Sequence, residues 1–241
     1  MPAERYYSDT PLKVNDRLHL DGSEHHHLAH VMRAKAGDHV EVVNGRGVLA
    51  IAQVEAIGRR DAELTVIESR LQPPSQCHVI IAQAIPRPNR LDMILEKGTE
   101  LGMGKLILFP GKRSERKHLN EKQLQRAKGV MVAAMKQCGR LYLPELQCVG
   151  SLLEAVAAPQ RLFGDIDPAA LPLIKVAEKL SLMENIVFFV GPESGFTDEE
   201  HDLLRHKISA IGVKLHRNIL RTDTASITAL AILDQFFLEF Q

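Results

Sequence analysis

The sequence has few cysteines, no net charge and no long run of apolar residues. Its three cysteines, Cys77, Cys138 and Cys148, lack the C-x-x-C spacing of metal or redox sites, so we expect reduced thiols in or near the core. No apolar run approaches the roughly 20 residues that span a bilayer. Residues Met1 to Leu12 are not typical of a signal or transit peptide. These absences predict a cytoplasmic protein without a membrane partner.

The absence of net charge hides an uneven distribution along the chain. The 30 Lys and Arg balance the 30 Asp and Glu, but residues 73–140 hold 13 basic side chains against 5 acidic ones. The flanking segments 1–72 and 141–241 are both net acidic. A middle segment this basic is either a surface for a polyanion such as RNA or a set of solvated helix faces, and charge alone does not decide between them.

Gln72-Pro73-Pro74-Ser75 marks the clearest boundary, because two consecutive prolines cannot continue a helix. Before it, short β-rich segments with glycine turns are typical of a small barrel, and Asn44-Gly45 is a hairpin signal. These segments are residues 39–43, 47–54 and 62–67. One helix is expected at Ser23–Arg33, capped by Ser23. We predict an N-terminal domain of residues 1–72 and a second domain of residues 73–241.

After the boundary, strands alternate with helices, which predicts an α/β domain with a mainly parallel sheet. Thr197, followed three residues later by Glu200, has the spacing of a capping box at the start of a helix. The expected strands are residues 79–85, 106–109, 161–163, 185–190 and 213–215. The expected helices are residues 89–101, 121–137, 197–205 and 224–240.

Two loops of this domain carry the residues of most chemical interest. Gly191 to Thr197 follow a wholly apolar strand, and the two glycines would let a ligand approach the backbone. Leu215 to Ser226 follow the last short strand and lead into a long apolar helix. Loops at the carboxyl ends of parallel strands are where open α/β sheets bind ligands. The alternatives are an ordinary strand-to-helix turn and, for Thr222 and Asp223, a helix cap.

These two loops resemble the signature motifs of the SPOUT methyltransferases. Gly-Pro-Glu-Ser-Gly-Phe-Thr at 191–197 is similar to the superfamily's Gly-Pro-Glu-Gly-Gly, with Ser194 in place of a glycine. Leu-His-Arg-Asn-Ile-Leu-Arg-Thr-Asp-Thr-Ala at 215–225 is similar to its Leu-Gly-x-Arg-Ile-Leu-Arg-x-Glu-Thr-Ala, with Asp223 in place of a glutamate. Further similarities narrow the resemblance to the small-subunit (16S) ribosomal RNA uridine-N3 methyltransferase family. They lie at residues 5–7, 26–33, 37–38, 44–45, 96–102, 114–116 and 136–140.

The resemblance covers nearly the whole chain and implies a fold, a cofactor and an assembly. The implied fold is a small N-terminal PUA-like β-barrel that binds RNA, followed by a SPOUT domain with a trefoil-knotted parallel sheet. The implied cofactor is S-adenosyl-L-methionine, and the implied assembly is a homodimer in which the partner completes each site. The cofactor-binding residues carried over from the motifs are Gly191, Glu193, Gly195, Leu215, Asn218, Ile219, Leu220, Arg221, Thr224 and Ala225.

The implied reaction is methylation of uridine N3 in ribosomal RNA of the small ribosomal subunit. The N3 atom carries a weakly acidic proton, which a base removes or which nearby positive charge makes easier to lose. The catalytic candidates are Arg217 and Arg221 for positive charge and Glu193 for the base. The candidates for RNA binding are Arg5, Arg33, Arg87, Arg90, Arg113 and Arg116.

Two other functions are alternatives. One is a ribose 2′-hydroxyl RNA methyltransferase of the same superfamily, against which the N-terminal similarity argues. The other is a non-catalytic RNA-binding ribosome assembly factor, against which the intact second motif argues. The cluster His25-His26-His27 with His30 is interpreted as a polar helix face and not as a metal site, because it lacks thiolate or carboxylate ligands from a second element.

Overall fold

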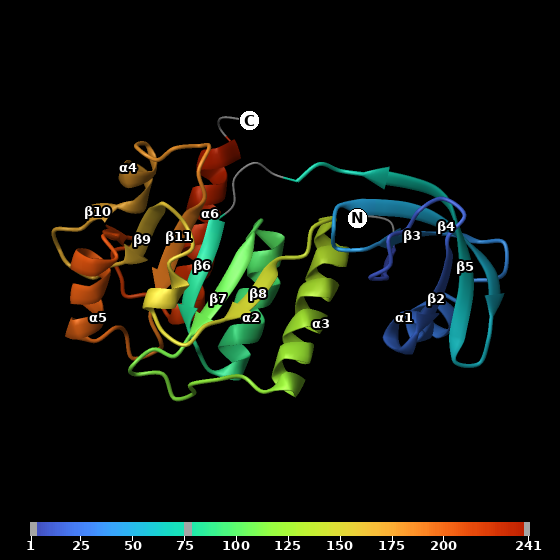
Figure 1. Ribbon diagram of the computed structural model, residues 1–241, viewed down its shortest axis with the longest axis horizontal. Helices are drawn as coiled ribbons and strands as arrows, with labels where there is room; N and C mark the ends of the chain where they lie inside the picture. The colour runs from blue at the N-terminus through green and yellow to red at the C-terminus, as the bar shows by residue number, and fades with distance from the viewer. Residues whose placement is uncertain (1–3, 75–78, 239–241) are drawn as a thin grey trace. The chain divides into compact units, whose positions relative to one another are not determined.

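The computed structural model describes residues 4–74 and 79–238. The chain divides into two compact units, one of Met1–Pro74 with Val132–Leu143 and the other of Ser75–Met131 with Pro144–Gln241 (Figure 1). The first division lies at the proline pair. Residues 132–143 group with the first unit, although the domains predicted from the sequence place them in the second.

The first unit contains a mixed five-stranded sheet in the order β1-β3-β4-β5-β2, in which only β1 and β3 pair in parallel. The hairpin at Asn44-Gly45 joins β3 to β4, and Gly45 adopts a φ of +69°. Three strands were expected from the sequence, whereas β1 spans only three residues and β2 was missed although Leu18 and Leu20 alternate with exposed polar residues. The strands are β1 (Arg5–Tyr7), β2 (Arg17–Asp21), β3 (His39–Val43), β4 (Val48–Ile57) and β5 (Asp61–Leu71).

The helix predicted at residues 23–33 is present, but it begins at Gly22 and becomes π-helical from His27. α1 (Gly22–His26) has no side-chain cap, so the predicted Ser23 cap is wrong. The chain continues as a π-helical turn, η1 (His27–Val31). His25 is buried, and its Nε2 lies 3.1 Å from a backbone carbonyl oxygen, so the histidine cluster is not a purely polar face. The described part of the chain contains no group of three or more side chains suited to a metal ion.

Residues 132–143 complete the first unit. Its main core contains buried side chains from all five strands and from the helical turn. A second small cluster joins Val43 of β3 to Met135 and Leu141. The Arg5 guanidinium donates a 2.6 Å hydrogen bond to the carbonyl oxygen of Gly139. The segment therefore supplies both apolar and polar contacts to the N-terminal sheet.

The second unit is built on a seven-stranded sheet in the order β10-β12-β9-β11-β6-β7-β8. Every neighbouring pair is parallel, which confirms the predicted sheet. All five side chains of β11 are buried, as its apolar sequence predicts. The edge strands β8 and β10 are mostly exposed and show no apolar run. The strands are β6 (Val79–Ala84), β7 (Lys105–Phe109), β8 (Glu145–Cys148), β9 (Gln160–Gly164), β10 (Leu171–Pro172), β11 (Ile186–Val190) and β12 (Ile211–Lys214).

Helices cover both faces of this sheet. On one face α2 and α4 pack against α6, which contacts β6 and β11. On the other face η2 contacts β7 and η3 contacts β12, and their buried side chains share one core cluster with Ala82 and Ala84 of β6. Because successive side chains of a strand point to opposite faces, Gln83 faces α6. The helices are α2 (Pro88–Glu100), α3 (Glu121–Cys138), η2 (Leu153–Ala155), α4 (Leu173–Ala177), α5 (Asp198–Asp202), the π-helical η3 (Leu203–Lys207) and α6 (Thr222–Leu238).

The order of the strands decides where the motif loops lie. β12, β9 and β11 are neighbours, so the loops at their carboxyl ends emerge side by side. The first motif follows β11 and the second follows β12. The two motifs, about 25 residues apart in the sequence, therefore share one edge of the sheet. The trefoil knot stays a prediction of the family resemblance.

The structure also bears on the expectations drawn from the lack of a long apolar run and from the few cysteines. Within the described ranges, no helix has both the length and the apolar character needed to cross a membrane. Cys138 is half-buried, as expected of a thiol near the core, but Cys148 is exposed on the edge strand β8, so the expectation is wrong for that residue. Cys77 lies outside the described residues.

Candidate active site

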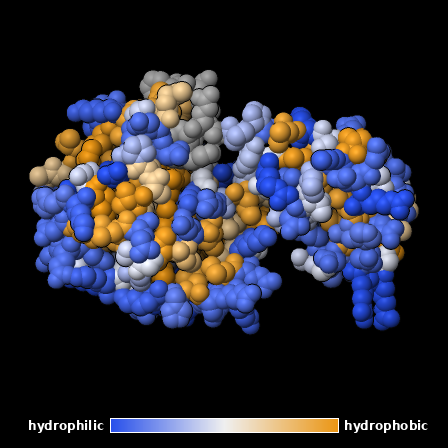
Figure 2. All heavy atoms as spheres, in the orientation of Figure 1, coloured by the Kyte–Doolittle hydropathy of each residue, from blue (hydrophilic) through white to orange (hydrophobic). Residues whose placement is uncertain are grey.

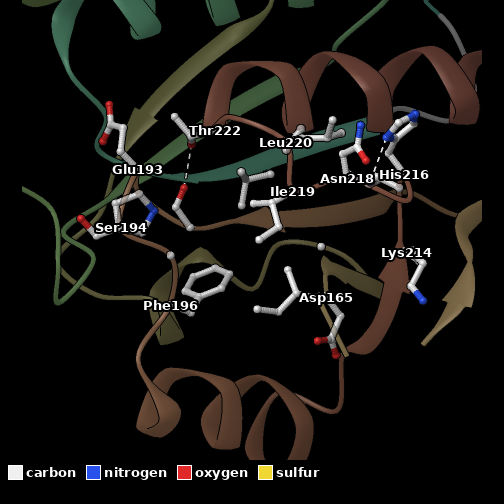
Figure 3. A pocket seen from close by; sticks show the side chains of 18 of the residues that line it. Asp165, Glu193, Ser194, Phe196, Lys214, His216, Asn218, Ile219, Leu220 and Thr222 are labelled. Carbon is white, nitrogen blue, oxygen red and sulfur yellow. Dashed lines mark hydrogen bonds between the residues drawn. The ribbon is translucent and has the colours of Figure 1, made fainter. Parts of the chain in front are cut away.

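A cavity of about 610 Å³ opens at the carboxyl edge of the parallel sheet. Its wall comes from the loops after β9, β11 and β12 and from the first turns of α6 (Figure 3). Glu193 and Lys214 lie on opposite sides of the hollow, with the apolar side chains of Ile219 and Leu220 between them. Mostly apolar walls with a few polar groups, in a cavity of this size, are typical of a site for a small organic cofactor.

The loop after β11 is tightly turned. The Gly195 nitrogen donates a 2.8 Å hydrogen bond to the Pro192 carbonyl oxygen, and Gly195 adopts a φ of +71°, which glycine tolerates best. A Cβ at Gly191 would lie 3.1 Å from the Phe196 nitrogen, which is a tight contact, so glycine favours this close approach. Ser194 is exposed and its φ is not positive, so the serine in place of a family glycine fits the loop without strain.

Arg113, from the loop after β7, holds this turn from outside. Its Nη1 donates to the carbonyl oxygens of Ser194 and Phe196, each at 3.1 Å. Arg113 also lines the cavity. The sequence predicts an RNA contact for this residue, which stays a prediction, whereas in the structure its guanidinium supports the cavity wall.

The helix that follows the turn begins with the predicted capping box. The Glu200 nitrogen donates to Thr197 Oγ1 at 3.2 Å, and the Thr197 nitrogen donates to Glu200 Oε2 at 2.9 Å. The other Glu200 oxygen accepts a 2.9 Å hydrogen bond from the Lys112 nitrogen. The buried Glu200 carboxylate therefore joins the start of α5 to the loop after β7.

The loop after β12 supplies the apolar part of the wall. Leu215, Ile219 and Leu220 line the cavity, and Ile219 is 82% exposed. Figure 2 shows apolar side chains gathered over β9 and β11 in this unit, with hydrophilic side chains around them. Covering an isoleucine as exposed as Ile219 with an apolar group is favourable, because it removes apolar surface from water. The Lys214 ammonium group donates to the Pro168 carbonyl oxygen at 3.1 Å and joins this loop to the one after β9.

The first turn of α6 is bonded to other segments. Thr222 is buried, and its hydroxyl donates a 2.7 Å hydrogen bond to the Gly191 carbonyl oxygen. Asp223 is also buried, and its Oδ2 accepts a 2.8 Å hydrogen bond from Arg90 of α2. The other oxygen, Oδ1, has no hydrogen-bond partner among the residues that the structure describes. Both side chains therefore bond across the fold, and the alternative of two simple helix caps is wrong.

The structure brings most of the predicted cofactor-binding residues together. Arg217, a catalytic candidate, also lines the cavity, whereas Arg221 and Thr224 are exposed and outside the wall. A helix turns by about 100° per residue, so Thr224 points away from the side of α6 on which Thr222 and Ala225 lie. The predicted residues in the wall are Gly191, Glu193, Gly195, Leu215, Asn218, Ile219, Leu220 and Ala225.

Sequence reasoning missed the part of the wall that follows β9. Asp165 is buried there, and its Oδ2 accepts a 2.7 Å hydrogen bond from Arg205. A Cβ at Gly212 of β12 would lie 2.2 Å from this Oδ2, so the glycine makes room for the carboxylate. An acid directly after a predicted strand was the available signal. Other missed wall residues are Ile166, Pro168, Pro192, Ser194, Phe196, His201, Lys214, His216 and Thr222.

Four of the six arginines predicted to contact RNA are already bonded within the protein. Arg90 and Arg113 make the contacts given above. Arg5 donates to Glu41 at 2.7 Å. Arg87 hydrogen-bonds Glu115, and this contact holds the pKa of that carboxyl below its usual range.

The other two arginines are available for a partner. Arg33 and Arg116 are exposed, and neither hydrogen-bonds or ion-pairs with another described residue. Arg33 adopts a φ of +55° directly after the π-helical turn η1. A guanidinium without an internal partner can pair with a phosphate at little cost, so these two arginines are the better candidates for RNA contacts.

Comparisons with known proteins find RNA methyltransferases. The profile of an RNA methyltransferase domain matches residues 73–234, and that of an RNA methyltransferase PUA domain matches residues 20–67. The chain is 32% identical over 221 residues to the ribosomal RNA small subunit methyltransferase E of Synechocystis, covering 88% of this chain and 71% of that protein. It is 26% identical to the enzyme of the same name from Rickettsia conorii, covering 96% and 95% of the two chains.

Solved structures agree on the fold. A ribosomal RNA small subunit methyltransferase E from Neisseria gonorrhoeae, bound to S-adenosyl methionine, superposes with a TM-score of 0.83 at 24% identity. The two chains cover 98% of each other. The two-part fold predicted from the resemblance, a PUA-like unit followed by a SPOUT-type parallel sheet, is therefore confirmed. On the profile match and the full-length relatives, the chain belongs to the RNA methyltransferase family whose members are named ribosomal RNA small subunit methyltransferase E.

Proposed function

We propose that this chain transfers a methyl group from S-adenosylmethionine to N3 of a uridine in small-subunit ribosomal RNA. The observation that carries the proposal is the meeting of the two motif loops, residues 191–197 and 215–225, in one cavity. The relatives are named for the methylation of small-subunit ribosomal RNA, and the Neisseria protein was crystallised with S-adenosyl methionine. The choice of uridine N3 rests on the motif resemblance. Because the proposed substrate is ribosomal RNA, we also propose that the protein acts in the cytoplasm.

The wall offers what an adenosyl group requires. Leu215, Ile219 and Leu220 supply apolar surface for the adenine ring, and the backbone around Gly191 and Gly195 supplies polar groups for its edge. Bound S-adenosylmethionine supplies a methyl group that is already activated by the positive charge on sulfur. The protein itself has to bind the cofactor and the RNA, to orient the target base and to accept the proton that leaves N3.

Orientation is the first part of that work. Holding the uridine N3 in line with the methyl group removes the entropy cost of bringing two molecules together, and such positioning can contribute up to roughly 7–11 kcal/mol. The target base has to leave its stack to enter the cavity. Arg33 and Arg116 are proposed to hold the RNA backbone without selecting the base.

The proton on N3 is the second part. Arg217 lies in the cavity wall, and its positive charge favours the uridine anion that forms when the proton leaves. Arg221 is proposed as a second positive charge, because it is exposed beside α6 and free to reach a bound RNA. Glu193 is proposed as the proton acceptor. Its Oε1 accepts a 2.9 Å hydrogen bond from the Arg87 nitrogen, which fixes the carboxylate at the edge of the cavity.

The homodimer is also proposed, with α6 at its centre. One face of α6 is buried, and the opposite face mixes polar with apolar side chains, among which Ile227 and Ala231 are partly accessible and Leu238 is exposed. Covering the accessible apolar side chains of this face is favourable, because it removes apolar surface from water. A second copy of the chain is the occupant that would bury this face and complete each site.

The first test identifies the product. Small-subunit ribosomal RNA incubated with the protein and methyl-labelled S-adenosylmethionine should yield 3-methyluridine when its nucleosides are separated by mass spectrometry. A 2′-O-methylated nucleoside would instead support the ribose methyltransferase. Cofactor binding without transfer to free RNA or assembled subunits would contradict the proposed reaction.

The second test concerns the cofactor. Gly195→Val should weaken S-adenosylmethionine binding at least tenfold in calorimetry, because a branched side chain would be strained at this φ and would stand in the cavity. Gly37→Val is the matched control, since Gly37 also has a positive φ and open space around its Cβ, but lies in the first unit. Equal affinities for the two variants would place the cofactor elsewhere.

The third test separates two arginines of one loop. Arg113→Ala should raise the Kd for S-adenosylmethionine several-fold, because the variant loses two hydrogen bonds to the turn after β11. Arg116→Ala should leave that Kd unchanged and weaken RNA binding, lowering the slope of affinity against salt by about one unit per lost phosphate contact. If Arg113→Ala changes only RNA binding, the guanidinium is a phosphate contact and not a support of the wall.

The fourth test concerns assembly. Light scattering should give a mass of about twice 26.8 kDa. Ile227→Glu should produce monomers with reduced methyl transfer, because it places a charge at an apolar position of the accessible face of α6. Val14→Glu, at an exposed position of the first unit, should change neither property. A fully active monomer would refute the shared site.

A further inference from the structure

Gln83 is a fully buried amide in an otherwise apolar strand. β6 has the sequence Val-Ile-Ile-Ala-Gln-Ala, and Gln83 is 0% exposed at its fifth position. The strand pairs with β11, where Val190 lies opposite Gln83. Gly191, the first residue of the loop after β11, comes next. The amide therefore lies directly beneath the wall of the cavity, but it is not itself part of that wall.

The amide links the two motif loops. Its Nε2 lies 2.9 Å from Thr222 Oγ1, 2.9 Å from the carbonyl oxygen of Ala84 in its own strand, and 3.1 Å from the Gly191 carbonyl oxygen. Its Oε1 accepts a 2.8 Å hydrogen bond from the Ser226 hydroxyl, one turn further along α6. Thr222 Oγ1 donates in turn to the Gly191 carbonyl oxygen at 2.7 Å. Four residues thus form one closed network between β6, the loop after β11 and the first turn of α6.

The donors and acceptors of this network allow only one orientation of the amide. Gly191 offers a carbonyl oxygen, which only accepts, and it is served by both Nε2 and the Thr222 hydroxyl. The Thr222 hydroxyl uses its own proton on Gly191, so its oxygen accepts from Gln83. The Ser226 hydroxyl donates to Oε1. Turning the amide over would place oxygen against oxygen at Gly191.

Stability alone does not explain a glutamine at this position. Removing an amide from water is costly, and a fully bonded polar group contributes little more than an apolar side chain of the same shape would. Every neighbour of Gln83 in β6 is apolar. What the amide provides, and an apolar side chain does not, is a directed bond to each of two loops that surround the cavity.

We propose that Gln83 is a positioning residue for the cofactor, which sets the separation between Gly191 and the first turn of α6. Because Gly191 and Thr222 both line the cavity, this separation fixes its width before any ligand arrives. A preformed wall does not have to be ordered on binding, so the affinity is higher. The inference rests on the proposed function, since it requires S-adenosylmethionine to bind in this cavity.

The test uses an apolar substitute of nearly the same shape. Gln83→Met should raise the Kd for S-adenosylmethionine at least tenfold and raise its KM in methyl transfer to a similar extent. The kcat at saturating cofactor should stay within about twofold of the wild type, because Gln83 does not touch the reacting atoms. Thr99→Val removes another fully buried hydroxyl, which donates to a backbone carbonyl oxygen within α2, and should leave the Kd unchanged.

A double variant separates positioning from stability. Gln83→Met leaves the Ser226 hydroxyl only its longer contact, the Thr222 carbonyl oxygen at 3.2 Å, and removes the donor to Thr222 Oγ1, whereas Ser226→Ala leaves the amide oxygen without a donor, so each single variant should lower the melting temperature. The double variant Gln83→Met/Ser226→Ala removes both groups, and its melting temperature should recover toward that of the wild type. Its affinity for S-adenosylmethionine should stay low.

The outcomes are distinct. If affinity recovers together with the melting temperature in the double variant, or if Gln83→Met binds like the wild type, the network is structural only and the proposal is wrong. If Gln83→Met does not fold, Ser226→Ala and the double variant still provide the comparison. A wild-type protein that fails to bind S-adenosylmethionine would refute the proposed function itself, which is a different result.

Discussion

The parallel order of β12, β9, β11 and β6 is the constraint on which the rest of the site depends. It places the carboxyl ends of these strands at one edge, so loops from residues 165–168, 191–196 and 215–220 surround one cavity. β11 carries this order, because its five side chains are all buried and it pairs with a strand on each side. A polar residue in β11 would disturb both neighbours, and the cavity would lose two of its walls.

Loops are normally the mobile parts of a fold, yet these are bonded at both ends. The turn after β11 is held by Arg113 from outside and by Thr222 and Gln83 from beneath. The capping box of α5 extends the same support, because Glu200 also bonds the loop after β7. The geometry of the wall is therefore set by hydrogen bonds of two residues within it, Arg113 and Thr222, and of two residues behind it, Gln83 and Glu200. A wall that is ordered in advance suits the proposed reaction, in which the cofactor supplies an activated methyl group and the protein aligns it with the target base.

Part of the positive charge of the basic middle segment is paired within the protein. Four of its cations pair with carboxylates of the acidic flanking segments: Lys136 with Glu24, Lys105 with Glu145, Lys112 with Glu199, and Arg90 with Asp223. An exposed pair such as Lys112 with Glu199 contributes only about 0–1 kcal/mol to stability, but all four pairs neutralise charge that would otherwise attract a polyanion. The positive surface that is left unpaired is smaller than the segment, and it includes the exposed Arg116.

The sequence by itself determined the class of fold, the two motifs and the family, because these depend on local patterns. The apolar run of β11, the Thr197–Glu200 spacing and the glycines at 191 and 195 each have one clear physical interpretation within a few residues. Only the tertiary structure decided which side chains work together. Gln83 lies 139 positions from Thr222, Arg113 lies 81 positions from Ser194, and Asp165 depends on the space left by Gly212. No periodicity marks such pairs, because a contact between distant segments is created by the order of the strands and not by the residues on either side of it.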